Sequence, residues 1–301
     1  MSPVHAPDTP NRTTEAQAPS SPWPRPGSSI DLALKSAPSQ RRTDLNGWAL
    51  WWHETAKIPL TIHDIGVAEA KLLWWLNAIQ EAQGGQAQHP VLRSLLAGAQ
   101  SPDDLPPWPW WTTQIQALMD YLHQNRWMNQ AGLDRHIEAT TGHAAMGAAW
   151  MLGAREASTL KAAQLWGIAT RHHHQLARLG WDARAGWVHV PVDVLQQFDV
   201  KAHQLVKPQA GQTPPGWAAL LRHLQGQASQ ATQAARLATR QLPAAERQKL
   251  RPLAVLGAAQ TAVGQAVAQA GDQVLFERVG LTPLAKTWAA QRQVWRLWWG
   301  A

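Results

Sequence analysis

Apolar residues recur along most of the chain at the spacing of an amphipathic helix. Trp48, Trp51 and Trp52 follow one another at i, i+3 and i+4, which predicts one buried helical face. Pro59 interrupts this first helix near its end, and the glycines that follow residue 83 end the second. The pattern predicts helices from Leu45 to about Pro59 and over about 67–83, 90–96, 110–130, 133–152, 157–179, 216–241, 244–270 and 283–299.

Two segments depart from this pattern. Residues 1–42 are rich in Pro, Ser and Thr and poor in large apolar residues, so burial cannot offset the entropy of ordering them, and we expect a disordered tail. Residues 186–191 (GWVHVP) alternate like an extended strand. Elsewhere the helices follow one another with short loops, which predicts a single all-α helical bundle over residues 43–301.

Composition narrows the class of protein. The chain has 19 Trp but only one Tyr and two Phe, so most aromatic positions of the core carry an indole N–H that needs a partner. Cysteine is absent, which excludes disulfides and thiolate chemistry and favours a reducing cytoplasm. No run of apolar residues is long enough to predict a membrane span.

The formal net charge of +7 fits a soluble basic protein, an attraction to an anionic membrane surface, or an attraction to diphosphate-bearing substrates. The basic residues are dispersed and no nucleic-acid-binding motif is present, so we expect no nucleic-acid partner.

Four segments together resemble the squalene/phytoene synthase family, in the order in which that family carries them. The segment GWDARAGWVHVP is the most specific of the four. The segments are LLWWLNAIQEAQGGQAQHPVLRSL (72–95), ALMDYLHQNRW (117–127), GWDARAGWVHVP (180–191) and the C-terminal stretch 242–288. The resemblance implies an α-helical isoprenoid-synthase fold around a central cavity. It also implies two aspartate-rich motifs whose carboxylates bind Mg²⁺, which in turn binds prenyl diphosphates for head-to-head condensation.

The second aspartate motif of that family is largely replaced here. His174 lies at its Asn position, Arg178 at its first Asp and Trp181 at its Glu, and only Asp182 is retained. A positive charge at a ligand position should cost several kcal/mol of cation binding. We therefore expect neither a metal site nor a bound cofactor at this motif.

The first motif is not found in any register of residues 48–66. That stretch contains Glu54 and Asp64, ten residues apart and separated by Pro59. A further family Asp falls on Tyr121, and Asp120 lies about 100° away around the helix. We therefore expect a protein that has lost Mg²⁺-dependent prenyl transfer.

Two functions remain open at this point. In the first, the chain has lost catalysis, has kept the fold and binds an isoprenoid, another lipid or a protein partner. The resemblance offers a precedent, since non-catalytic members of that family act as assembly factors for respiratory complexes. In the second, the chain is an active prenyl transferase acting on farnesyl or geranylgeranyl diphosphate. Its Mg²⁺ site would then be rebuilt from four carboxylates on different helices: Asp182, Asp120, Asp64 and Glu54.

Basic residues near Asp182 suggest a different way to hold a diphosphate. Arginines can bind phosphate directly through bidentate hydrogen bonds, and a solvated basic face is the simpler interpretation. The candidates for diphosphate binding are Arg171, His174, Arg178 and Arg184. The tract His172–His174 is not expected to bind metal, because adjacent helical residues point about 100° apart.

The C-terminal segment WAAQRQVWRLWWG interleaves Trp with Arg. This composition fits either a helix at a membrane interface or a last helix that docks its tryptophans on the domain. The first interpretation predicts a cytoplasmic protein that contacts the inner membrane peripherally.

Overall fold

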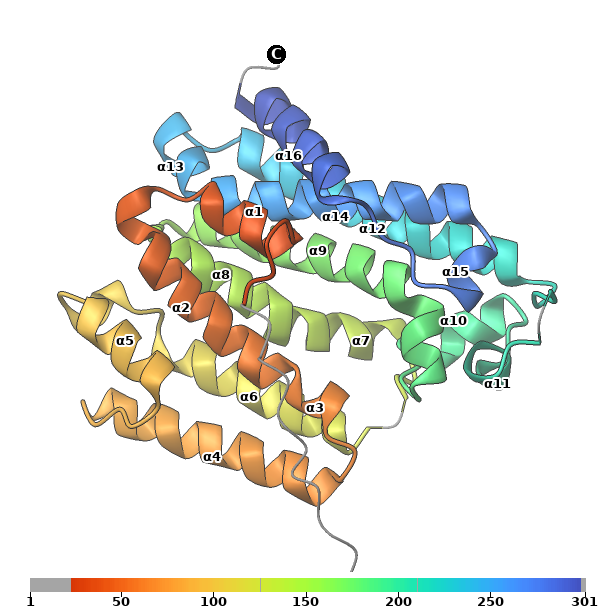
Figure 1. Cartoon of the computed structure of the whole chain (residues 1–301), viewed down its shortest axis with the longest axis horizontal. Coiled ribbons are helices and arrows are strands. Elements are labelled where there is room, and N and C mark those ends of the chain that lie inside the picture. Colours follow the sequence, from red (N-terminus) through yellow and green to blue (C-terminus); the bar gives the residue numbers. More distant parts are fainter. Residues whose placement is uncertain (1–22, 125, 210, 299–301) are drawn as a thin grey trace, which may run out of the picture.

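The structure, a computed structural model, describes residues 23–124, 126–209 and 211–298. These residues form helices joined by loops and contain no strand, which confirms the predicted all-α class (Figure 1). None of the described helices is long and apolar enough to cross a membrane. The first helices are α1 (Ser29–Lys35), α2 (Ser39–Ala56), α3 (Ile58–Thr61), α4 (Ile65–Gln83), α5 (Pro90–Gly98), the 3₁₀ helix η1 (Pro102–Asp104), α6 (Trp108–Leu122), α7 (Gln130–Ile137), the π-helix η2 (Glu138–Gly142) and α8 (His143–Met151). They continue with α9 (Ala157–Arg184), α10 (Val192–Gln197), α11 (Ala202–Val206), α12 (Trp217–Arg240), α13 (Ala244–Lys249), α14 (Arg251–Ala270), α15 (Gln273–Phe276) and α16 (Pro283–Trp298).

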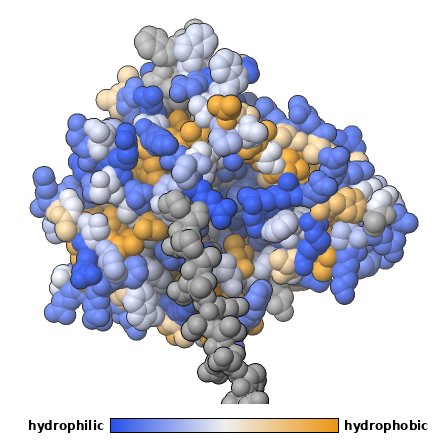
Figure 2. Space-filling model, viewed as in Figure 1, coloured by the Kyte–Doolittle hydropathy of each residue, from blue (hydrophilic) through white to orange (hydrophobic). Residues whose placement is uncertain are grey.

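Helix α9 is the central element of the bundle. It spans 28 residues and packs against α8, η2, α12 and α14. In Figure 1, α12 and α14 lie above it, α7 and α8 lie below it, and α6 and α4 lie further below. Small residues allow this close packing, because a Cβ added at Gly167 would lie 2.3 Å from the carbonyl oxygen of Thr141. The view in Figure 2 shows a mostly hydrophilic surface with separate hydrophobic patches.

A group of three indoles forms the centre of the larger core. Trp48 and Trp51 of α2 meet Trp111 of α6 with ring centroids 4.5–4.9 Å apart, and all three are almost fully buried. The indole N–H of Trp48 donates to the carbonyl of Ala144 at 2.8 Å. The predicted core stripe of the first helix is therefore confirmed. The indole N–H groups of Trp48 and Trp111 donate to backbone carbonyls, whereas the buried indole N–H of Trp51 has no hydrogen-bond partner among the described residues.

We expect Gly147→Ala to destabilise the protein by about 2–3 kcal/mol, as overpacking of a filled core does. An added Cβ would lie 2.1 Å from Cζ2 of the buried Trp48 ring. The matched control is Gly226→Ala in α12, where an added Cβ meets nothing within 4 Å, so that the higher helix propensity of Ala should stabilise by up to about 1 kcal/mol. Urea unfolding measures both, and equal shifts in the two variants would contradict the packing argument.

The N-terminal part of the domain begins earlier than the sequence pattern predicts. Helix α1 lies inside the expected tail, and Ser28 caps it by accepting a hydrogen bond from the backbone N–H of Asp31 at 3.2 Å. Its residues Ala33 and Leu34 are buried, which supplies the burial that the composition did not indicate. Residues 1–22 of the predicted tail lie outside the described residues.

The predicted strand at residues 186–191 is wrong. This segment is a loop in which Val188, His189 and Val190 are all buried. Gly186, with φ +95°, turns the chain back after α9. The alternation in the sequence reflects a buried loop that packs on helices and has no strand beside it.

Candidate functional site

The last turns of α9 carry the residues that the resemblance places at the second aspartate motif. Arg178 and Asp182 lie one turn apart and form an ion pair, with Nη2–Oδ1 at 2.7 Å and Nε–Oδ1 at 3.0 Å. The side chain of Asp182 is 8% exposed and that of Arg178 is 24% exposed. A cation from the same helix therefore occupies the one carboxylate that this motif retains.

His189 approaches the same carboxylate from the loop after α9. Its Nε2 lies 3.3 Å from Asp182 Oδ2, and the backbone N–H of Trp187 donates to the Asp182 carbonyl at 2.8 Å. Burial alone would raise the pKa of Asp182, but its contacts with His189 and Arg178 outweigh burial and lower the pKa to about 2. Burial lowers the pKa of His189 as well. At neutral pH an ionised Asp182 therefore lies between a guanidinium and a neutral imidazole.

Arg171 and His174 lie on the same stretch of α9. The Nη1 atom of Arg171 is 3.5 Å from Nδ1 of His174. Burial, followed by the charges of Arg171 and Arg178, lowers the pKa of His174 to about 3, so this imidazole is neutral. Burial also lowers the pKa of Arg171, and its attraction to Tyr121 and Asp182 opposes that effect. Two guanidinium groups face one carboxylate here, which leaves the site net positive.

A stack of aromatic rings packs beside these charges. Tyr121 at the end of α6 stacks on Trp127 and Trp187 with centroids 5.8 and 5.2 Å apart. His136 of α7 lies 5.1 Å from Tyr121 and 4.9 Å from Trp127. Burial raises the pKa of Tyr121, and burial together with Arg171 lowers that of His136 to about 3. These neutral rings therefore occupy the space beside the ion pair.

The other candidate carboxylates have local structural roles. Glu54 on α2 pairs with Lys57 at 2.7 Å. Asp64 is the exposed N-cap of α4, and Asp120 is exposed on α6. Across the described residues, no three His, Asp or Glu side chains are grouped so that they could hold a metal ion. The donor set near Asp182 therefore does not fit the Mg²⁺ that the resemblance implies.

Arg184 is turned away from the other basic candidates. Its Nη1 donates to the carbonyl of Leu275 in α15, whereas Arg178 is bound to Asp182 on α9. Of the arginines predicted to surround a diphosphate, Arg171 and Arg178 are the two that lie near Asp182.

The three consecutive histidines have three different surroundings. His172 borders a cavity, His173 Nε2 lies 2.9 Å from Thr232 Oγ1 of α12, and His174 lies at Arg171. The helical geometry therefore separates them as the 100° spacing predicts.

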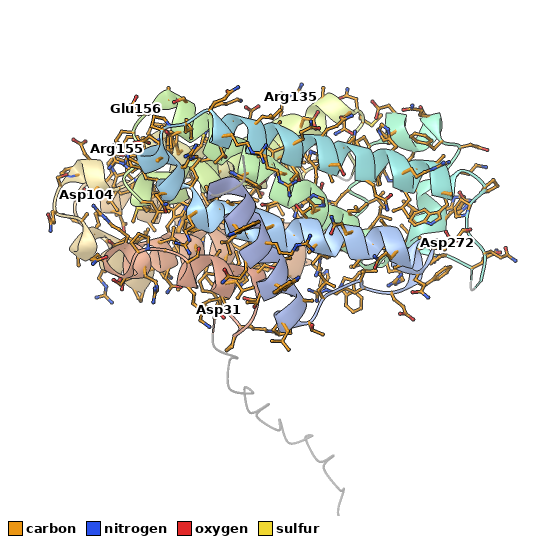
Figure 3. The ribbon with its side chains drawn as sticks, turned by 90° about the horizontal axis from the view of Figure 1, so that it is seen from above. Asp31, Asp104, Arg135, Arg155, Glu156 and Asp272 are labelled. Atoms are coloured by element: carbon orange, nitrogen blue, oxygen red, sulfur yellow. The ribbon has the colours of Figure 1, made fainter. Side chains whose placement is uncertain are left out.

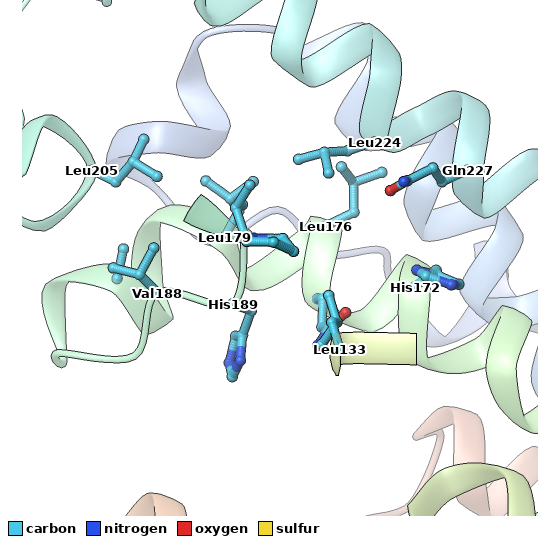
Figure 4. Close-up of a pocket in the computed structure, with 13 residues that line it drawn as sticks. Leu133, His172, Leu176, Leu179, Val188, His189, Leu205, Leu224 and Gln227 are labelled. Carbon is cyan, nitrogen blue, oxygen red and sulfur yellow. The ribbon is translucent and has the colours of Figure 1, made fainter. Parts of the chain in front are cut away.

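The cavity next to this site is small. It has a volume of about 30 Å³ and lies between α7, α9, α11 and α12. Leu133, Leu176 and Leu179 line it, with His172 and His189 at its edge (Figure 4). Such a volume holds about two water molecules, whereas ligand pockets usually measure about 300–1,000 Å³.

Several of these residues were not predicted from the sequence. Tyr121, Trp127, His136 and His189 come from four different segments, and periodicity within one helix carries no information about such long-range contacts. The available signal was the resemblance itself, since His189 lies in GWVHVP and Tyr121 lies where the family has an Asp.

The sequence model of the squalene/phytoene synthase family matches residues 24–287 of this chain. The chain therefore belongs to the squalene/phytoene synthase family. No curated protein sequence matches it.

Three solved structures share the fold at low sequence identity. A dehydrosqualene synthase in complex with a ligand is 15% identical with a TM-score of 0.73, covering 89% of this chain and 91% of that one. Squalene synthase HpnC from Alicyclobacillus acidocaldarius is 14% identical with a TM-score of 0.60, covering 79% and 98%. YisP from Bacillus subtilis subsp. subtilis strain 168 is 15% identical with a TM-score of 0.62, covering 87% and 89%. At these identities the likeness establishes the isoprenoid-synthase fold.

Proposed function

We propose that this chain is a non-catalytic member of its family that binds an isoprenoid, another lipid or a protein partner. The observation that carries the proposal is the ion pair between Arg178 and Asp182 on α9. Departure of a diphosphate requires neutralisation of the developing negative charge, which carboxylate-bound Mg²⁺ supplies in metal-dependent transferases. Here the carboxylate is bound to an arginine, so it is unavailable to a cation.

The packing around the site supports the same proposal. A prenyl chain needs an apolar tunnel, and the cavity beside Asp182 has only about 30 Å³. The rings of Tyr121, Trp127 and Trp187 fill the neighbouring space. A partner would therefore contact the outer surface, and a bound isoprenoid would require these rings to move.

The test is incubation of the purified protein with farnesyl or geranylgeranyl diphosphate and Mg²⁺, followed by solvent extraction. We expect no condensed C30 or C40 product, while a dehydrosqualene synthase assayed in parallel forms its product. A cooperative thermal transition of the same preparation shows that the protein is folded. Condensed product at a rate that depends on Mg²⁺ would overturn the proposal in favour of an active transferase.

A second arm measures binding of farnesyl diphosphate in EDTA by calorimetry. Binding that Arg171→Gln weakens would show that the site has kept diphosphate recognition through arginine. Absence of binding would mean that the partner is another lipid or a protein, which still agrees with loss of catalysis.

A further inference from the structure

Helix α16 presents a stripe of large apolar side chains to solvent. Leu284, Trp288 and Trp295 are 83%, 68% and 66% exposed, and their spacing of four and seven residues places them on one face of the helix. On the opposite face, Ala290 is buried against Ala33 of α1 and Val255 of α14. The helix is therefore docked through Ala290 and directs Trp288 and Trp295 outward, although Trp is on average a highly buried residue.

All charged residues of the C-terminal segment 278–301 are basic. Residues 278–301 contain no Asp or Glu, and their cations are Arg278, Lys286, Arg292 and Arg296. Arg292 is exposed and lies one turn from Trp288, on the same face as the stripe. Exposed indoles interleaved with cations are typical of helices that lie at a membrane interface.

A second basic segment lies on the same side of α14. Figures 1 and 3 show α13 and α16 together over the outer side of α14. Between residues 240 and 251 the only carboxylate is Glu246, which is bound by Lys249 and by Thr159. The cations of this segment are Arg240, Arg247, Lys249 and Arg251.

A basic pocket lies between the end of α1 and the segment 240–251. It has a volume of about 410 Å³ and is lined by Lys35, Lys249 and Arg251. Ala290 of α16 packs on Val255, one helical turn from Arg251, and on Ala33, two residues from Lys35. Helix α16 therefore packs on α1 and α14, the two helices that contribute Lys35 and Arg251 to this pocket.

We propose that this face, α16 together with the basic segment 240–251, docks on the surface of a bilayer that contains anionic phospholipids. The indoles would enter the headgroup region, and the cations would be attracted by the negative surface potential. A second copy of the chain is a poor occupant, because pairing this face with itself would bring the cations of the two copies together, and they would repel one another. The inference does not depend on the loss of catalysis.

Vesicle flotation tests the proposal with the full chain. We expect flotation with phosphatidylglycerol-containing vesicles, little with pure phosphatidylcholine, and a decrease as NaCl is raised from 50 to 500 mM. Trp288→Ala and Trp295→Ala should each weaken binding roughly tenfold, and Arg292→Glu by roughly fivefold or more. The matched control is Trp181→Ala, since Trp181 is 51% exposed on α9 and lies outside this face.

Two results would overturn the proposal. The first is equal flotation of wild type, Trp288→Ala and Trp295→Ala, provided that all three melt at the same temperature. The second is a dimer, measured by light scattering after size exclusion, that Trp288→Ala dissociates without any vesicle binding by the wild type. Product formation in the prenyl transfer assay would leave this inference unaffected.

Discussion

Lowering the pH from 7 to 5 is expected to reduce the free energy of unfolding of this protein by about 6 kcal/mol. Three half-buried or buried histidines account for this figure, because the pKa of His136 and of His174 is lowered to about 3 and that of His173 to about 4. The lowered pKa values of His172 and His189 act in the same direction. Since domains are usually stable by about 5–15 kcal/mol, we expect the protein to be close to unfolding in mild acid.

The direction of the effect follows from proton binding in the two states. Below an unfolded pKa of about 6.5 the unfolded chain takes up a proton on each imidazole, whereas the folded chain does not until the pH approaches 3–4. Stability is therefore fully present above pH 6.5 and falls as the pH decreases towards the folded pKa values. Each histidine contributes about 2 kcal/mol of the loss at pH 5. Asp182, whose pKa is lowered to about 2, is ionised in both states over this range and contributes only below pH 4.

The physical cause is burial next to fixed cations. Burial is the main cause for each of the three. His136 and His174 also face Arg171, and His174 faces Arg178, while Asp182 gives only partial compensation. A proton on His174 would place a third positive charge beside two guanidinium groups and one carboxylate.

Urea unfolding at pH 7, 6 and 5 measures the effect in wild type and in His174→Asn. Asn does not titrate, so the difference between pH 7 and pH 5 should fall from about 6 to about 4 kcal/mol in this variant. His63→Asn, at an exposed side chain, controls for the removal of an imidazole elsewhere. An unchanged pH dependence in His174→Asn would show that His174 is not a source of the acid lability.

The fold followed from the sequence wherever one helix face decides burial. Trp48 and Trp51 are buried as their spacing predicts, and α4 ends at Gln83, before the glycines. The predictions were weaker where burial comes from distant parts of the chain. Helix α1 is ordered by α14, which α1 contacts across more than two hundred residues of sequence. The loop 186–191 is buried by helices, and the alternation of its own residues cannot indicate such contacts.

For the site, the sequence predicted which groups are missing better than which groups are present. The resemblance placed Arg178 at a ligand position, and the structure shows this arginine bound to Asp182. The resemblance gave no indication that His189 would approach the same carboxylate or that Tyr121 would stack on Trp187. Such contacts are set by the packing of four separate segments, which no local pattern encodes.

Arg178→Asp is expected to destabilise the protein by about 4 kcal/mol or more and to make its stability depend on Mg²⁺. The change removes the partner of a carboxylate that is only 8% exposed, and loss of one partner of a buried ion pair costs about 3–5 kcal/mol. It also places a second carboxylate one turn from Asp182, so repulsion adds to the loss. Two carboxylates on one helix face are hard oxygen ligands, so Mg²⁺ should bind between them and restore part of the stability.

Thermal unfolding with 0 and 10 mM MgCl₂ at constant ionic strength measures both effects. For a dissociation constant of about 1 mM, 10 mM Mg²⁺ should restore about 1.4 kcal/mol in Arg178→Asp. Arg178→Asn removes the same cation without adding a carboxylate, so it should be destabilised but insensitive to Mg²⁺. A Mg²⁺ effect of equal size in both variants, or a wild-type melting temperature for Arg178→Asp, would mean that the Arg178–Asp182 pair does not take the place of a divalent cation in this fold.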